Sequence, residues 1–116
     1  MPLSIYQGND KAFTFTRRDL NGNIIATVPQ GMWFTVKSRL ENKSFVFQKT
    51  LNNGINQNSD GSWTVLINAE DTAELTTGKY YCDVKIRDEQ GREITIVKPQ
   101  IFAVEDVATM LLNEGV

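Results

Sequence analysis

The ten residues from Gly78 to Arg87 alternate between two kinds of side chain. One set is apolar or aromatic and the other is mostly charged: Tyr80, Cys82, Val84 and Ile86 against Tyr81, Asp83, Lys85 and Arg87. Because successive side chains of a β-strand point to opposite faces, this segment is predicted to be a strand with one dry and one wet face. The turn Asp88-Glu89-Gln90-Gly91 then closes it. Such a strand belongs to an antiparallel sheet with one buried side.

Tyr80 stands two residues before Cys82, in a strand that is entered through Gly78. This local pattern is typical of strand F of an immunoglobulin domain with its tyrosine corner. Since Cys82 is the one cysteine of the chain, no disulfide can form within it. We therefore predict an all-β, immunoglobulin-like antiparallel sandwich of about seven or eight strands without a disulfide. Tyr80, Cys82 and the inward-pointing Trp63 are predicted to hold this fold.

Short alternating runs separated by turn signals divide the rest of the chain. The predicted strands are 5–8, 11–17, 24–28, 32–39, 44–50, 63–67, 78–87 and 92–98. After Pro99, residues 100–104 are either a last strand or the continuation of the same one after a bend. In the fifth run Phe45 and Phe47 are both expected to point inward. Asn68 to Leu75 is a short helical candidate with Asn68 as its N-cap. The domain is predicted to span residues 1–104, followed by a tail at 105–116.

The bulk properties exclude several classes of function. With 116 residues the chain is one domain with a single core. A net charge of −2 argues against binding to duplex nucleic acid. No apolar run approaches a membrane span, and the start of the chain lacks the pattern of a signal peptide, so we expect no membrane partner and folding in the cytoplasm.

Histidine is absent from the sequence, which removes the usual general base and the usual metal ligand. Cys82 is expected to be a buried, unreactive thiol. Asn56, Asn58 and Asp60 resemble the start of a calcium loop, but the position of the bidentate Glu is Ile67, so a polar hairpin loop is favoured. The sequence thus predicts no enzyme, no catalytic residue, no cofactor and no metal.

Two readings remain open for Trp33. Met32, Phe34 and Val36 make the better core set, so Trp33 is expected to face outward unless the register slips or the N-terminal segment covers it. Together with Tyr81 and Val97 it would then form a surface patch for a protein or a glycan. A basic group could also form an edge, although solvated faces and edge-protecting lysines are the commoner explanation. Its members are Arg17, Arg18, Lys37, Arg39, Lys43 and Lys49.

The tail carries Val107, Met110 and Leu111 at helical spacing. Twelve residues are marginal as an isolated helix, so the tail is interpreted either as a frayed end or as a short helical segment that docks on another subunit. A homo-oligomer is left open by this pattern.

The order of the motifs resembles small immunoglobulin-like proteins of tailed bacteriophages, including the N-terminal domain of baseplate upper proteins. The motifs that carry the resemblance are Gln7 to Asp10, Asp60 to Val65, Ala69 to Leu75, Gly78 to Val84, Asp88 to Gly91 and Phe102 to Thr109. The resemblance implies a non-enzymatic virion protein, made in the bacterial cytoplasm, that contacts other phage structural proteins. The alternative is a carbohydrate-binding module in which Trp33 and Tyr81 stack on host-surface sugars.

Overall fold

The computed structural model describes residues 3–106, which form eight strands and one short helix. The strands are β1 (Leu3–Tyr6), β2 (Lys11–Phe15), β3 (Gly31–Lys37), β4 (Phe47–Leu51), β5 (Gly54–Gln57), β6 (Trp63–Ile67), β7 (Gly78–Arg87) and β8 (Glu93–Glu105), with helix α1 at Ala69–Ala73. The prediction of an all-β fold is confirmed. Within the described range Cys82 is a free thiol in the interior.

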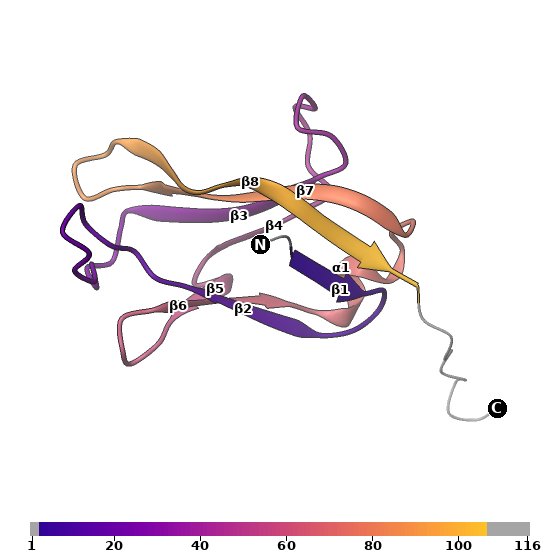
Figure 1. Ribbon diagram of the computed structural model, residues 1–116, viewed down its shortest axis with the longest axis horizontal. Coiled ribbons are helices and arrows are strands. Elements are labelled where there is room, and N and C mark those ends of the chain that lie inside the picture. Colours follow the sequence, from indigo (N-terminus) through magenta and orange to yellow (C-terminus); the bar gives the residue numbers. More distant parts are fainter. Residues whose placement is uncertain (1–2, 107–116) are drawn as a thin grey trace.

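The hydrogen-bonded strands follow the order β1-β8-β7-β3-β4-β5-β6-β2. β8, β7 and β3 lie in one layer, and β5, β6 and β2 lie in the other (Figure 1). The path between the layers runs through β4, which pairs antiparallel with β3 and shares a two-residue parallel contact with β5. β1 pairs in parallel with the last part of β8. The result is a β-sandwich whose layers face each other across one core.

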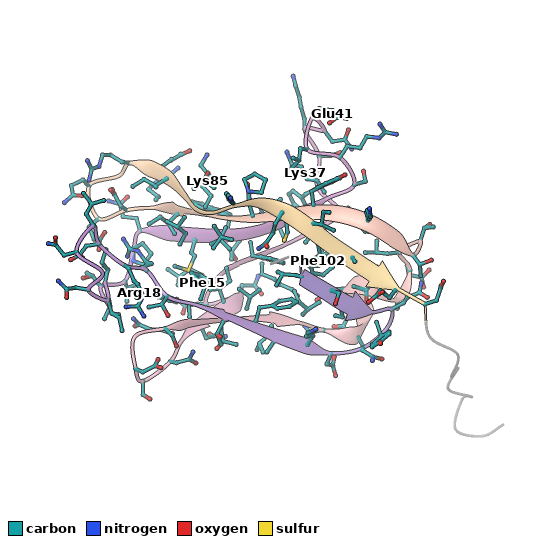
Figure 2. The ribbon with its side chains drawn as sticks, in the orientation of Figure 1. Phe15, Arg18, Lys37, Glu41, Lys85 and Phe102 are labelled. Carbon is teal, nitrogen blue, oxygen red and sulfur yellow. The ribbon has the colours of Figure 1, made fainter. Side chains whose placement is uncertain are left out.

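The core contains the alternate residues of the central strands. Met32, Phe34 and Val36 of β3 are at most 2% exposed, as the alternation predicted. Phe102 of β8 is fully buried, and its ring lies between those of Phe13, Phe34 and Phe47 at centroid distances of 5.9 to 6.2 Å. Phe15 and Phe102 lie between the two layers (Figure 2). Aromatic packing therefore takes the place of a disulfide at the centre of the sandwich.

Helix α1 and the Tyr80 side chain close one end of the sandwich. Asn68 precedes the helix, and its backbone N–H donates to the Asp71 carboxylate at 2.7 Å. Asp71 also pairs with Lys49 of β4 at 2.7 Å, which ties the helix to the sheet. The Tyr80 hydroxyl donates to the Thr76 carbonyl at 2.6 Å. This hydrogen bond connects β7 to the segment that joins it to the helix.

The strand predictions differ from the structure in residues 24–28 and in the connection that precedes β6. Residues 24–28 form an irregular segment with only an isolated bridge between Arg18 and Ile24. β5 lies within a stretch that was expected to be a polar connection, because Ile55 is buried and anchors a short strand against β6. β8 continues through Pro99, so of the two alternatives for residues 100–104 the structure shows the continuation of the same strand; Pro99 lies at a register shift, where β7 has no residue paired with it.

The predicted helical tail, with Val107, Met110 and Leu111, lies outside the described residues. β8 itself extends to Glu105. Of the helices described, none has the length and apolarity to cross a bilayer.

Candidate functional site

Trp33 lies on the outer face of the β3/β7 layer. Trp33 is half-buried, whereas its neighbours Met32 and Phe34 are in the core. The structure therefore shows the outward orientation of Trp33. The Arg87 guanidinium lies 5.7 Å from the centroid of the indole ring. Gly31 leaves room for the ring, because a Cβ at this position would stand 2.7 Å from the Trp33 Cη2 atom. Trp33 is therefore held flat against the sheet between a glycine and a cation.

The segment between β3 and β4 rises away from this face of the sheet (Figure 1). It carries Phe45, which is 52% exposed rather than directed inward as predicted. The expected strand begins only at Phe47, so the inward alternation does not extend back to Phe45. Between this segment and the β7–β8 hairpin lies a hollow of about 460 Å³, lined by Trp33, Phe45 and surrounding polar side chains. We call it the outer groove.

The outer groove is electropositive. Its charged lining consists of Lys37, Lys43, Lys85 and Arg87 against Asp83 and Glu93, a formal charge of +2. The chain as a whole carries −2. Lys37 and Lys85 extend from the outer side of the layer (Figure 2). Positive charge is thus concentrated around two aromatic side chains on an otherwise acidic protein.

Asp83 stands at an irregularity in the middle of β7. The register with β8 shifts between Cys82 and Val84, where Lys98 and Pro99 of β8 stand opposite the single residue Asp83, as in a β-bulge of β8. Among residues 3–106 its carboxylate has neither a salt bridge within 4.0 Å nor a hydrogen bond. Burial raises the pKa of Asp83, and the positive charges of Lys37 and Lys85 oppose this rise. The groove therefore contains one carboxylate that is not neutralised by a direct contact.

Glu93, at the end of the groove near the β7–β8 turn, forms ion pairs, in contrast to Asp83. It accepts from Lys85 at 2.8 Å and from Arg87 at 2.9 Å. Hydrogen bonds from these two cations, followed by their charge, lower the pKa of Glu93 to about 2. Lys85 and Arg87 are thereby fixed in position along one wall of the groove, whereas Lys43 stands exposed on the opposite wall.

The structure separates the three residues expected to form one patch. Tyr81 of β7 faces outward like Trp33, but the β7 residue that pairs with Trp33 is Lys85. Tyr81 lies four residues from Lys85 along β7, so it is roughly 13 Å from the level of Trp33. Tyr81 lines a second hollow on the other side of the β3–β4 segment. Val97 pairs with Val84 and packs against the core. Its assignment to the outer patch is wrong, because the irregular register in β7 and β8 turns it inward.

The other residues singled out from the sequence have structural roles. Trp63 and Cys82 are at most 2% exposed, and burial raises the pKa of the Cys82 thiol to about 12, with the Asp83 charge adding to the shift. Arg17 is buried against the Thr27 carbonyl and Glu89. Lys49 is neutralised by Asp71, so of the predicted basic group only Lys37 and Lys43 line the outer groove.

The predicted polar hairpin is stabilised by contacts of its own. The Asp60 carboxylate accepts from the backbone and the hydroxyl of Ser62 at 2.9 and 2.6 Å. Asn58 donates to Thr64 at 2.8 Å. Between residues 3 and 106 no three His, Cys, Asp or Glu side chains are grouped closely enough to hold a metal ion.

Comparisons with known proteins bear on the fold. No family model matches the chain, and no curated protein matches it. Among solved structures, the chain is similar to CopC from Methylosinus trichosporium OB3b, with a TM-score of 0.51 and 12% identity over 95% of this chain and 89% of CopC. At this identity the likeness shows a shared β-sandwich fold and nothing about the site.

The comparisons correct the functional prediction made from the sequence. The solved structure described above is CopC, and nothing in that likeness points to a phage protein or to a sugar-binding module. The assignments to a phage virion protein, to location in the virion and to a carbohydrate-binding alternative are therefore wrong. The motifs behind the resemblance are turns and alternating strands, which many β-sandwiches share because the same backbone geometry requires them.

Proposed function

We propose that this protein is a non-enzymatic binding domain whose outer groove takes an acidic segment of a partner protein. The observation that carries the proposal is the concentration of four cations and two outward aromatic side chains in one hollow of a chain with a net charge of −2. Charge complementarity steers and orients partners, and aromatic residues with arginine are the side chains most enriched among binding hot spots.

The arrangement of the groove supports a partner that is extended and partly apolar. Trp33 provides a flat floor, Phe45 provides an exposed wall, and the basic side chains surround both. A segment in which carboxylates alternate with apolar residues would place its charges near Lys43 and Lys85 and its apolar groups on the rings.

The absence of catalysis is part of the proposal. The chain has no histidine to act as a general base. The Cys82 thiol has a pKa of about 12 and lies in the core, so it stays protonated at neutral pH. None of the residues that line the groove is a Ser or a Cys. Binding is the simplest activity that the described residues support.

We also propose that the sandwich is immunoglobulin-like. The hydrogen bond from Tyr80 to the Thr76 carbonyl has the position of a tyrosine corner. β3 lies between β7 and β4, and β6 lies between β5 and β2, as strands C and E do in immunoglobulin domains.

The test uses tryptophan fluorescence, because Trp33 borders the groove whereas Trp63 is 1% exposed. The probe is a 12-residue peptide in which Glu alternates with Ser and Leu, and the control peptide has Lys in place of every Glu. We expect saturable quenching by the Glu peptide only. Equal responses to both peptides, or a stronger response to a DNA duplex, would overturn the proposal.

A paired variant links the signal to the groove. Lys43→Glu/Phe45→Ala changes two exposed side chains of the groove wall and leaves the core untouched. Its affinity for the Glu peptide should fall at least tenfold. Leu40→Ala is the matched control, since Leu40 is exposed on the same segment but lines the other hollow. Unchanged binding by the double variant would place the peptide elsewhere.

A further inference from the structure

Asp83 belongs to a row of polar side chains that crosses three strands under the outer groove. Thr35 of β3 is in register with Asp83 of β7 on one side and with Gln48 of β4 on the other. All three side chains are partly buried and line the groove. The Gln48 amide Nε2 donates to the Thr35 hydroxyl at 2.9 Å, which leaves the Gln48 carbonyl oxygen as a further acceptor. The row thus offers a carboxylate, a hydroxyl and an amide carbonyl to a hydrogen-bond donor.

The two cations whose charges act on Asp83 have other hydrogen-bond partners. Lys37 Nζ donates to the Asn42 carbonyl at 2.6 Å. Lys85 Nζ pairs with Glu93 at 2.8 Å. Among residues 3–106 no cation forms a salt bridge with the Asp83 carboxylate within 4.0 Å. A partly buried carboxylate is thus left open to a cation that a partner supplies.

The charges that face the groove alternate in sign along β7. Lys37 of β3 is in register with Tyr81, and Asp83 and Lys85 follow at two-residue steps along β7. Each step advances the strand by roughly 7 Å, so the order of charges is positive, negative and positive. The side chains on one side of an extended segment have the same two-residue spacing. The complementary pattern is therefore Glu-x-Lys-x-Glu, which is the same in both chain directions.

The two carboxylates of this pattern are needed because the groove as a whole is positive. Lys37 is bonded to a neutral carbonyl, and the single Glu93 carboxylate is shared by Lys85 and Arg87. Both levels beside Asp83 therefore keep an excess of positive charge, which attracts a carboxylate and repels an isolated lysine. A lysine between two carboxylates can contact Asp83 while its neighbours offset the charge of the groove.

We infer that the outer groove recognises an extended segment with the pattern Glu-x-Lys-x-Glu, in which the lysine ammonium binds Asp83. The two carboxylates then face the levels of Lys37 and Lys85. The ammonium has three N–H donors, and the row of Asp83, Thr35 and Gln48 supplies the acceptors. The inference rests on the proposed function, because it specifies the acidic segment that the same groove takes.

Two isomeric peptides test the inference. Both are the Glu peptide described above with blocked ends and one Glu replaced by Lys, either a central Glu or the last one. Their composition and net charge are the same, so charge steering alone predicts equal affinities. We expect the wild type to bind the central-Lys peptide roughly three- to fivefold more tightly by tryptophan quenching, because one partly exposed ion pair contributes modestly. Equal affinities, or tighter binding of the end-Lys peptide, would overturn the inference.

Asp83→Asn links this preference to the carboxylate. The variant keeps the size and shape of the side chain and removes its charge, so the preference for the central-Lys peptide should disappear. Glu41→Gln is the matched control, because Glu41 is an exposed carboxylate that lines the other hollow. This control should keep the preference. A preference that persists in Asp83→Asn would show that another group binds the lysine, contrary to the inference.

Failure of the inference and failure of the proposed function give different results. Quenching by the Glu peptide with equal affinities for the two isomers would reject the lysine contact and leave the acidic-segment function standing. An absence of quenching by all three peptides would reject both.

Discussion

The inner and outer faces of β3 and β7 alternate along the same two strands, yet they differ in almost every physical respect. The inner face holds Phe34 and Cys82, which are 2% exposed, and the thiol has a pKa of about 12. The outer face holds Trp33, Lys85 and Asp83 around a hollow of about 460 Å³. The comparison teaches that one pair of strands can hold part of the core on one side and a charged hollow on the other, because neighbouring side chains point in opposite directions. Substitutions on the two faces should therefore have separable effects.

The largest expected effect is on the inner face. Phe102→Ala removes the ring that contacts Phe13, Phe34 and Phe47, and it should lower the free energy of unfolding by about 3–5 kcal/mol. Urea denaturation measures the change. Leu20→Ala is the control, because Leu20 is fully exposed. A loss below about 1 kcal/mol would mean that the aromatic cluster is not the centre of stability.

Trp33→Ala, on the outer face, should change the affinity for the Glu peptide more than it changes the free energy of unfolding. Removal of the groove floor is expected to weaken binding of the Glu peptide roughly tenfold, equivalent to about 1.4 kcal/mol. Because the ring is only half-buried, the loss of unfolding free energy should be well below that of Phe102→Ala. Calorimetric titration with the peptide and urea denaturation give the two numbers. If Trp33→Ala binds the Glu peptide with unchanged affinity, the peptide does not bind to this face.

Tyr80→Phe tests the corner that orients β7 for both faces. It removes the hydrogen bond of 2.6 Å to the Thr76 carbonyl, and the expected loss of stability is about 1 kcal/mol. Tyr81→Phe is a matched control, since the Tyr81 hydroxyl has no hydrogen-bond partner among residues 3–106. The melting temperatures should fall for the first variant only. Equal melting temperatures would show that the corner contributes packing rather than a hydrogen bond.

The smallest effect concerns Asp83, the carboxylate at the irregular point of β7. Asp83→Asn removes a negative charge from the groove, so binding of the Glu peptide at neutral pH should strengthen roughly two- to fivefold. Burial raises the pKa of Asp83, so the carboxylate is charged above that raised pKa and neutral below it. The difference between wild type and variant should consequently be present at neutral pH and disappear as the pH falls. Weaker binding by Asp83→Asn would indicate that Asp83 contacts the partner directly.

Local alternation accounts for most of what was predicted correctly. The buried set of β7, the outward Trp33, the helix after Asn68 and the corner at Tyr80 all depend on residues close together in the sequence. The errors lie where distant segments determine the outcome. Val97 was placed on the wrong face because the register shift at Cys82 and Val84 is a property of two paired strands and not of either alone.

The outer groove was only partly foreseeable. Trp33, Lys37 and Lys43 were noted from the sequence, but as members of different groups. Phe45 was expected to point inward, and no sequence signal showed that β4 begins two residues later. Lys49 looked like its basic neighbours, yet its contact with Asp71 of α1 removes it from the surface charge.

The sequence by itself determined the class of fold and the absence of a histidine base and of an internal disulfide. A period of two places apolar residues on one face wherever a strand forms, and a chain without histidine and with one cysteine has neither a His base nor an internal disulfide. Only the tertiary structure decided which charges meet. Whether a lysine forms an ion pair, as Lys49 does with Asp71, or stays exposed, as Lys43 does, depends on the register of strands that are far apart in the sequence. That register is fixed by packing of the whole core rather than by any local pattern.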